Sequence, residues 1–276
     1  MHARLAAQLS GMTSGEKYTA ETITWLHRWT PGLFSFRTTR SKGFRFVPGQ
    51  FARLGVQKFD QAGNASTVWR AYSMVSAHYD DFLEFYSIVV PNGEFTTELS
   101  RLTVGDTLFV EKTSYGFMTL ARFEQGGAPG KDLWLLASGT GLAPFLSILS
   151  DPHTWESYEN LVLVHSVRHS PELTYLDQID AFNTGDLFGS FGCRLTYLPV
   201  VTREQIPGAL NSRITSLVDD GRLEAAAGVD LDLDRSRIML CGNPDMLTDT
   251  RKVLKKQGFR LSRSAQPGQI AVENYW

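Results

Sequence analysis

The sequence predicts two domains: an antiparallel β-barrel or sandwich over residues 16–125, followed by an α/β domain with a parallel sheet over residues 126–276. Three observations carry this prediction. Short apolar or alternating runs broken by turn residues fill the first part, and apolar runs alternate with helix-like segments in the second. A glycine-rich stretch at residues 126–130 separates the two, and residues 1–15 are interpreted as a loose terminal arm.

The first domain is expected to consist of short strands joined by tight turns. Its strands are predicted at residues 33–38, 50–56, 67–75, 82–90 and 107–111, with turns at Val47-Pro48-Gly49, Pro91-Asn92-Gly93 and Val104-Gly105-Asp106. Proline fixes φ for the turn, while glycine and asparagine accept conformations that other residues avoid. Strands this short and this closely spaced are typical of an antiparallel barrel or sandwich.

The second domain is expected to alternate buried strands with helices. Strands are predicted at residues 133–137, 161–165, 194–201 and 237–240, and helices after the first glycine-rich turn and at residues 171–182 and 244–258. Asn243 is expected to cap the last of these helices, with Pro244 in its first turn. Apolar strands that alternate with helices indicate βαβ units and a parallel sheet covered on both faces.

Composition limits the function classes. With 276 residues and 42% hydrophobic content, the chain can bury a large core. Its 27 basic and 29 acidic residues give a net charge of −2, which argues against nucleic-acid binding. No apolar run reaches 18 residues, so no membrane insertion is predicted. Two cysteines form neither a disulfide framework nor a cysteine-based metal site, so we expect a cytoplasmic protein without a bound metal.

A glycine-rich segment, Ala-Ser-Gly-Thr-Gly-Leu-Ala-Pro at residues 137–144, follows the first predicted strand of the second domain. Glycines let a backbone approach a diphosphate, and a helix N-terminus supplies free N–H groups. The segment lacks the third glycine of the G-x-G-x-x-G dinucleotide fingerprint, and an ordinary tight turn is the alternative. Its place between a strand and a helix favours phosphate binding.

Three arginines follow successive predicted strands: Arg168, Arg203 next to Thr202, and Arg213. Arg168 stands where an NAD site usually places an acidic residue for the ribose hydroxyls. Guanidinium groups bind phosphates with two parallel hydrogen bonds, so this set favours NADP over NAD. Each arginine alone is more simply a solvated surface residue. Their joint position at the carboxyl ends of parallel strands favours a binding site.

Two further segments admit both a structural and a functional interpretation. The segment Arg-Ala-Tyr-Ser at residues 70–73 alternates like an amphipathic strand, yet Arg70 could neutralise a diphosphate, Tyr72 could stack on a ring and Ser73 could bond a ring nitrogen. Periodicity alone favours the plain strand. Cys241 ends a predicted strand, so its thiol either packs in the core or faces the ligand crevice.

Five segments taken together resemble the ferredoxin–NADP reductase family over residues 16–276. They are the segment at 70–73, Val-Pro-Asn-Gly-Glu-Phe-Thr at 90–96, Gly-Thr-Gly-Leu-Ala-Pro at 139–144, Leu-Cys-Gly-Asn-Pro at 240–244, and the aromatic C-terminus. The terminal Tyr275-Trp276 resembles the bacterial branch that includes the flavodoxin/ferredoxin–NADP reductases of enteric bacteria. Ser138 replaces a threonine common in the family, and Glu273 matches the terminal glutamate of the plastid enzymes. The fifteen-residue arm has no counterpart.

The resemblance implies a six-stranded antiparallel Greek-key barrel that binds FAD, followed by an α/β domain with a five-stranded parallel sheet that binds NADP(H). The implied FAD contacts are Arg70 at the diphosphate, Ala71 beside it in the same segment, Tyr72 and Tyr275 on the two flavin faces, Ser73 near N5, Ile88 at the ribityl or flavin edge, Glu94, Phe95 and Thr96 at the diphosphate, Thr140 where both cofactors meet, and Trp276 on the adenine. The implied NADP contacts are Arg168, Thr202, Arg203, Arg213 and Asp249. Tyr72, Ser73, Cys241 and Tyr275 form the implied catalytic set.

The implied activity is hydride transfer from NADPH to flavin N5, followed by one-electron transfer to ferredoxin or flavodoxin. Tyr275 and Trp276 are expected to gate the nicotinamide. A monomer is expected, with a basic rim for an acidic partner drawn from Arg37, Arg40, Lys42, Arg45, Lys252, Lys255, Lys256, Arg260 and Arg263. The competing interpretations are an oxygenase reductase component, a free flavin reductase and, from a different class, a non-catalytic redox-sensing flavoprotein. Two cysteines are too few for a fused iron–sulfur domain.

Overall fold

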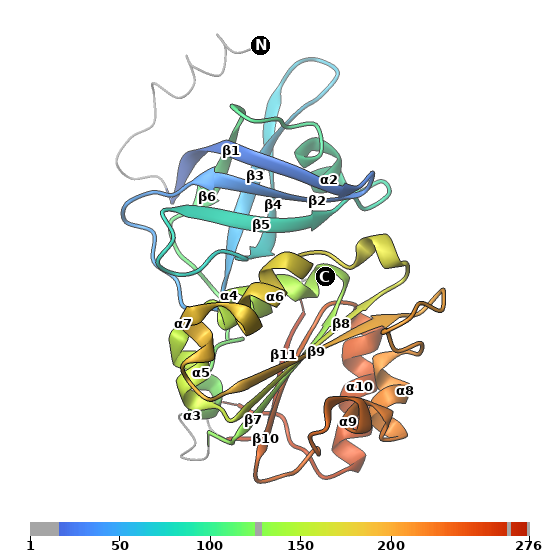
Figure 1. Ribbon diagram of the computed structural model, residues 1–276. Helices are drawn as coiled ribbons and strands as arrows, with labels where there is room; N and C mark the ends of the chain where they lie inside the picture. The colour runs from blue at the N-terminus through green and yellow to red at the C-terminus, as the bar shows by residue number, and fades with distance from the viewer. Residues whose placement is uncertain (1–16, 125–128, 264–265, 275–276) are drawn as a thin grey trace.

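The computed structural model describes residues 17–124, 129–263 and 266–274. It has one mainly antiparallel β domain stacked on an α/β domain with a parallel sheet (Figure 1). The predicted fold class is therefore confirmed. Within the described residues, no helix has the length and apolar character needed to cross a membrane.

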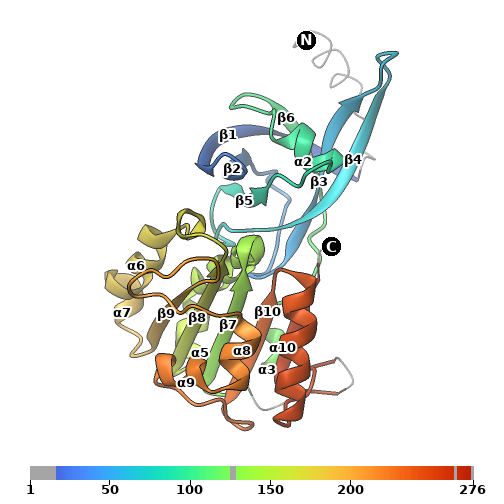
Figure 2. The same cartoon turned by 90° about the vertical axis from the view of Figure 1, so that its right-hand side faces the viewer.

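The first domain is built on six antiparallel strands. They are β1 (Tyr18–Thr30), β2 (Leu33–Thr39), β3 (Phe51–Phe59), β4 (Ala65–Ser73), β5 (Phe82–Ile88) and β6 (Thr107–Glu111), in the order β4-β3-β6-β1-β2-β5. An antiparallel bridge between Met74 and Phe85 brings the two ends of this order together and closes the barrel. Helix α2 (Glu94–Leu99) follows β5, and the long β3–β4 hairpin extends beyond the barrel (Figure 2).

Alternation along the strands fills the barrel interior. Phe34 and Phe36 on β2, Leu54 on β3 and Phe85 on β5 are fully buried in one cluster. The first strand of the barrel was not predicted, because residues 18–30 mix aromatic, charged and small polar side chains without a clean period. Its long pairings with β2 and β6 define it instead.

The second domain contains a five-stranded parallel sheet. Its strands are β7 (Asp132–Ser138), β8 (Asn160–Val167), β9 (Arg194–Val201), β10 (Ser236–Cys241) and β11 (Ile270–Glu273), in the order β11-β10-β7-β8-β9. Its helical segments are α3 (Ala121–Glu124), η1 (Gly139–Leu142), α4 (Ala143–Leu149), α5 (Pro152–Ser157), η2 (Ser170–Glu172), α6 (Leu176–Thr184), α7 (Asp186–Gly189), α8 (Ile214–Asp219), α9 (Arg222–Ala227) and α10 (Pro244–Lys256).

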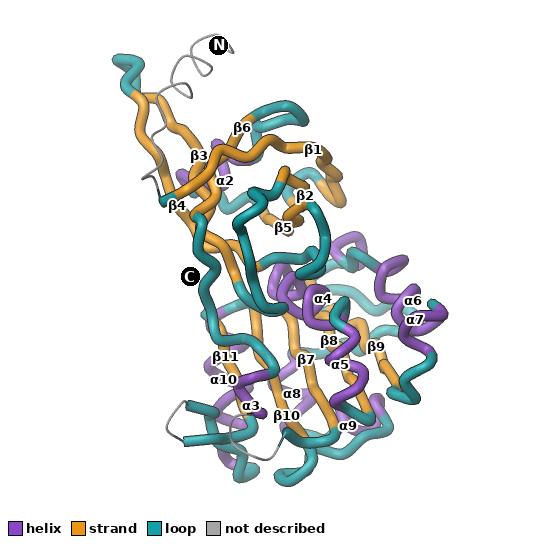
Figure 3. Tube along the Cα trace, turned by 90° about the vertical axis from the view of Figure 1, so that its left-hand side faces the viewer, coloured by secondary structure: helices purple, strands orange, loops and turns teal. Residues whose placement is uncertain are grey.

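Both faces of the parallel sheet are covered. Leu133 and Leu135 of β7 point into the cluster formed with α4 to α7, whereas Trp134 and Leu136 point into the cluster formed with α8 to α10. Figure 1 shows these two helix groups on opposite sides of the sheet, and in Figure 3 the group α4 to α7 faces the viewer. Burial on both faces explains why the strands read as continuous apolar runs.

One local prediction is corrected, and one further strand was missed. The helix expected at residues 171–182 begins only at Leu176, because a short 3-10 turn and Tyr175 in a left-handed conformation precede it. The edge strand β11 was not predicted, since a run of four residues gives little periodicity. The expected cap is present: Asn243 accepts hydrogen bonds from the amides of Asp245 and Met246, and Pro244 opens α10.

Candidate active site between the domains

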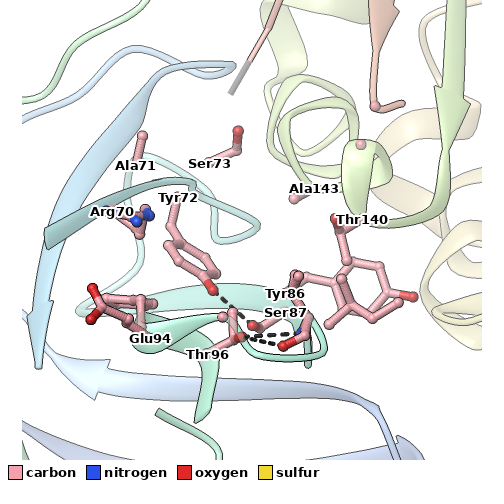
Figure 4. Close-up of a pocket in the computed structure, with 16 residues that line it drawn as sticks. Arg70, Ala71, Tyr72, Ser73, Tyr86, Ser87, Glu94, Thr96, Thr140 and Ala143 are labelled. Carbon is pink, nitrogen blue, oxygen red and sulfur yellow. Dashed lines mark hydrogen bonds between the residues drawn. The ribbon is translucent and has the colours of Figure 1, made fainter. Parts of the chain in front are cut away.

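A cavity of about 570 Å³ lies where the two domains meet. Its wall in the first domain comes from β4, β5 and the start of α2, and its wall in the second comes from the turns after β7 and β10. Its lining residues are Arg70, Ala71, Tyr72, Ser73, Tyr86, Ser87, Ile88, Val90, Gly93, Glu94, Phe95, Thr96, Thr140, Gly141, Ala143 and Gly242. Figure 4 shows residues 70–73 on one side and Thr140 and Ala143 on the other. The residues expected from the sequence to bind FAD thus line one cavity, except Tyr275 and Trp276, which lie outside the described residues.

The end of strand β4 shapes one wall. The Tyr72 hydroxyl lies 2.8 Å from Ser87 Oγ, and its ring packs against Phe85 and Phe95. Burial raises the pKa of Tyr72 to about 12, so its hydroxyl stays neutral. Ser73 Oγ is buried and has no hydrogen-bond partner among the described residues. A buried hydroxyl without a partner is costly, so Ser73 Oγ is a free polar group in the cavity wall that a ligand atom would satisfy.

The segment after β5 contributes backbone as well as side chains. Glu94, Phe95 and Thr96 form the first turn of α2, where amides have no acceptor within their own helix. The Thr96 hydroxyl accepts from the Val90 amide at 3.0 Å, so its first role is to hold the turn before the helix. The Glu94 side chain is exposed and pairs with Lys58 at 2.8 Å.

The opposite wall lies at the switch point of the parallel sheet. Strand order reverses between β7 and β10, and ligands of open α/β sheets bind at such a point, beyond the carboxyl ends of the strands. Thr140 and Gly141 follow β7, and Gly242 follows β10. A Cβ on Gly141 would overlap the Cys241 carbonyl, and one on Gly242 would overlap Ser138. Glycine is therefore required for these two turns to approach each other.

The predicted NADP residues lie away from this cavity's lining. Arg168 and Arg203 are adjacent, since the Arg203 amide donates to the Arg168 carbonyl at 3.0 Å. Thr202 Oγ1 donates to the Val167 carbonyl at 3.1 Å, and Arg213 precedes α8. All three arginine side chains are exposed, and no ion pair engages them within the described residues. Unneutralised guanidinium groups at the carboxyl edge of the sheet suit a phosphate.

Four other predicted residues have different outcomes. Asp249 lies in α10 and pairs with Lys252 at 3.1 Å. Cys241 is fully buried, is not among the cavity lining, and burial raises its pKa, so the structure shows a packed thiol rather than one facing the crevice. The catalytic role of Cys241 stays a prediction. The buried thiol lacks the exposure that a reacting thiol needs. Tyr275 and Trp276 lie outside the described residues, as does the arm at residues 1–15.

Two candidate rim residues also have structural partners. Arg37 donates to Glu84 at 2.8 Å, and its guanidinium lies over the Trp25 and Phe82 rings. Arg40 donates to the carbonyl oxygens of Phe44, His78 and Asp80. The Arg37 contacts join strands β1, β2 and β5, and the Arg40 contacts hold loops of the first domain.

Sequence reasoning missed Tyr86 and Ser87 as lining residues. Both lie on β5 and are almost fully buried, yet they reach the cavity at the junction of the domains. The segment Phe-Tyr-Ser-Ile at residues 85–88 looks like an ordinary barrel strand, and only its nearness to the family motif at 90–96 pointed toward it. Ile88, which was predicted, is 41% exposed and presents an apolar surface to the cavity.

A buried histidine beside the glycine-rich turn predicts acid sensitivity. His165 Nε2 lies 3.2 Å from the Gly139 carbonyl, and burial lowers the pKa of His165 to about 4. As pH falls below the ordinary value of about 6.5, the unfolded chain takes up the proton first, so the folded state loses stability until about pH 4. We expect this group to cost about 2 kcal/mol of unfolding free energy between pH 7.5 and pH 5.

Urea denaturation of His165→Gln and of the unaltered protein at both pH values measures this contribution. Gln does not titrate, so the difference between the two proteins must shrink as pH falls. A pH-independent difference would contradict the assignment.

Comparison with known proteins finds relatives that match most of the chain. Residues 135–252 match the family described as the oxidoreductase NAD-binding domain. Ferredoxin–NADP reductase A of Sorangium cellulosum is 42% identical over 259 residues, which cover 93% of this chain and 89% of that one. Ferredoxin–NADP reductase of Pseudomonas aeruginosa is 40% identical over 257 residues, 92% of this chain and 95% of that one.

A solved structure is similar over nearly the whole chain. The ferredoxin NADP+ reductase of Neisseria gonorrhoeae with bound FAD and NADP is 35% identical, has a TM-score of 0.84 and covers 95% of this chain and 100% of that one. The barrel, the switch-point cavity and the oxidoreductase domain define a two-domain nucleotide-dependent oxidoreductase. The chain belongs to the ferredoxin–NADP reductase family.

Proposed function

We propose that this protein binds FAD in the cavity between its domains and exchanges electrons between NADP(H) and a one-electron carrier. The proposal rests on the buried Ser73 hydroxyl, which has no hydrogen-bond partner among the described residues and lies in a cavity that the switch-point turns also line. The relatives' names and the Neisseria gonorrhoeae structure with bound FAD and NADP support it. The proposed division is an arm at 1–15, an FAD domain at 16–125 and an NADP domain at 126–276 in a cytoplasmic monomer.

The lining residues fit FAD chemically. The cavity volume falls in the range of cofactor pockets, and its wall combines apolar surface with a few polar groups. Arg70 supplies a cation for a diphosphate, and the first amides of α2 supply donors for the same group. Tyr72 presents an aromatic ring, and Ser73 a hydroxyl that can bond a ring nitrogen.

When bound, FAD supplies hydride acceptance at N5 and single-electron release to the carrier. The residues of this chain bind and orient it. Tyr72 is held by Ser87, Phe85 and Phe95, so its ring is fixed before any ligand enters. Thr140 faces the same cavity from the second domain. We assign it to the place where the two cofactors would meet. The proposed contacts of the 2′-phosphate side are Arg168, Arg203 and Arg213. Thr202 and Asp249 are proposed as further contacts of the same nucleotide.

The proposed acceptor is ferredoxin or flavodoxin, as the relatives' names suggest. Purified protein should be yellow, and it should oxidise NADPH faster than NADH with ferricyanide as acceptor. Addition of ferredoxin or flavodoxin with cytochrome c as reporter then tests the carrier. Protein without flavin would contradict the FAD proposal, and flavin without NADPH oxidation would point to a redox-sensing flavoprotein. If the protein reduces neither carrier but reduces free flavin, a free flavin reductase is favoured. If it reduces neither carrier but reduces an oxygenase, an oxygenase reductase component is favoured.

We also propose that Tyr275 and Trp276 limit nicotinamide residence. Deletion of both residues is expected to tighten NADP+ binding by roughly tenfold or more and to lower turnover, because the aromatic competitor is lost. Equilibrium titration and steady-state kinetics measure the two effects. Unchanged affinity and turnover would remove the idea.

A further inference from the structure

The loop before α6 reaches from the second domain into the first. Tyr175 Oη lies 2.5 Å from Ser35 Oγ on β2 and donates to Glu84 Oε1 on β5 at 2.9 Å. Next to it, Thr174 Oγ1 donates to the Tyr86 hydroxyl at 2.8 Å. All of these side chains are buried, so both contacts are made away from water. Two adjacent residues thus carry side-chain hydrogen bonds across the domain junction.

The polar partners of Tyr175 form a continuous donor chain. The indole N–H of Trp29 donates to Ser35, which leaves the Ser35 proton for the Tyr175 oxygen. Tyr175 in turn donates to Glu84, whose other carboxylate oxygen accepts from Arg37 at 2.8 Å. Each group therefore has a partner, and a buried network satisfied in this way specifies one arrangement of the two domains.

Tyr175 also adopts an unusual backbone conformation. Its φ is 59°, in the left-handed region that residues with a Cβ seldom occupy. Such a conformation persists where the surrounding contacts determine it. The Tyr175 ring packs edge-on against Tyr86, with centroids 5.3 Å apart, and against Trp29 at 5.0 Å. The strain is thus placed where the ring and hydroxyl meet the first domain.

Tyr86 connects this junction to the cavity. It is 3% exposed, and what it exposes lines the cavity beside Ser87, the partner of Tyr72. The loop that carries Thr174 and Tyr175 begins at Arg168, one of the arginines proposed to bind phosphate. The Arg168 amide donates to the Glu172 side chain at 3.0 Å. Residues 168–175 therefore span from the arginines of the second domain to the cavity wall of the first.

We propose that Thr174 and Tyr175 are positioning residues, which fix the Tyr86 wall of the cavity and thereby align the FAD site with the nucleotide site. This inference rests on the proposed function. Thr174 sets the Tyr86 hydroxyl, while Tyr175 locks the junction through Ser35 and Glu84. Neither residue lines the cavity, so each acts through Tyr86 and the domain arrangement.

The test compares Thr174→Val, which keeps the shape but removes the hydroxyl, with Thr174→Ser, which retains it. Thr184→Val, an exposed residue at the end of α6 whose hydroxyl bonds its own helix, is the matched control. We expect T174V to weaken FAD binding to the stripped protein about fivefold, to shift the flavin absorption bands and to lower kcat about tenfold, with little change in KM for NADPH. T174S and T184V should resemble the unaltered protein.

A double-mutant cycle with Tyr86→Phe keeps the inference falsifiable if one variant folds poorly. If the hydroxyl pair positions the wall, Y86F and T174V/Y86F should match T174V in spectrum and FAD affinity. Additive effects, or a T174V that loses only thermal stability, would overturn the inference while the proposed function stands. An unaltered protein that binds no FAD would overturn the proposed function, and this inference with it.

Discussion

Replacement of Tyr72 by alanine is expected to yield protein that retains FAD about a hundredfold less tightly and shows little NADPH oxidation. The side chain supplies an aromatic face at the cavity, and it is held by Ser87 at 2.8 Å and by packing against Phe85 and Phe95. Loss of stacking and of apolar contact with the ring removes about 2–3 kcal/mol of binding free energy. Equilibrium titration of stripped protein with FAD, followed by flavin fluorescence, measures this change.

Tyr72→Phe is the matched control, because it preserves the ring and removes only the hydroxyl that contacts Ser87. We expect Y72F to bind FAD within a few fold of the unaltered protein, since one neutral hydrogen bond contributes about 1 kcal/mol. Equal weakening in Y72F and Y72A would show that the hydroxyl, rather than the aromatic face, matters. Unchanged binding in both would place FAD elsewhere.

Replacement of Arg203 and Arg213 by alanine is expected to abolish the preference for NADPH over NADH. Both guanidinium groups are exposed at the carboxyl edge of the sheet, and no ion pair engages them among the described side chains. They are thus available for a phosphate, which NADH lacks. We expect KM for NADPH to rise about a hundredfold, while KM for NADH changes little, because each charge-assisted bond is worth roughly a factor of ten.

Arg260→Ala serves as the control, since the Arg260 side chain is exposed and follows α10. The Arg260 carbonyl accepts hydrogen bonds from the amides of Gln269 and Ile270, which the substitution leaves in place. Steady-state kinetics with both nucleotides and ferricyanide give the ratio directly. A double variant that still prefers NADPH would remove these two arginines from the 2′-phosphate site and leave Arg168 as the candidate. Equal losses with NADPH and NADH would indicate a general defect in the second domain.

Local patterns predicted much of the architecture. The strands at 107–111 and 194–201 have their predicted bounds, and the cap at Asn243 is present. These succeed because alternation, apolar runs and cap chemistry act over a few residues. Strands β1 and β11 were missed, since β1 has no clean alternation and β11 is only four residues long, so pairing with neighbouring strands defines both.

The candidate site was predicted in parts. Residues 70–73 and Thr140 were expected from the family resemblance, and they line one cavity. Tyr86 and Ser87 were missed, because a buried strand residue that faces a barrel core looks the same as one that faces a domain junction. Cys241 was open to two interpretations, a packed thiol or one at the crevice, and its side chain lies in the core cluster beneath α4 to α7.

The sequence by itself determined the two domain classes, the glycine-rich turn and the arginines that follow parallel strands, because each depends on short-range chemistry. Only the tertiary structure decided that Tyr86 forms a cavity wall and that Thr174 and Tyr175 hold it. The Thr174–Tyr86 bond joins residues 88 positions apart, and the Ser35–Tyr175 contact joins residues 140 positions apart. Contacts at such separation arise from how two complete domains pack, and no local pattern encodes that packing.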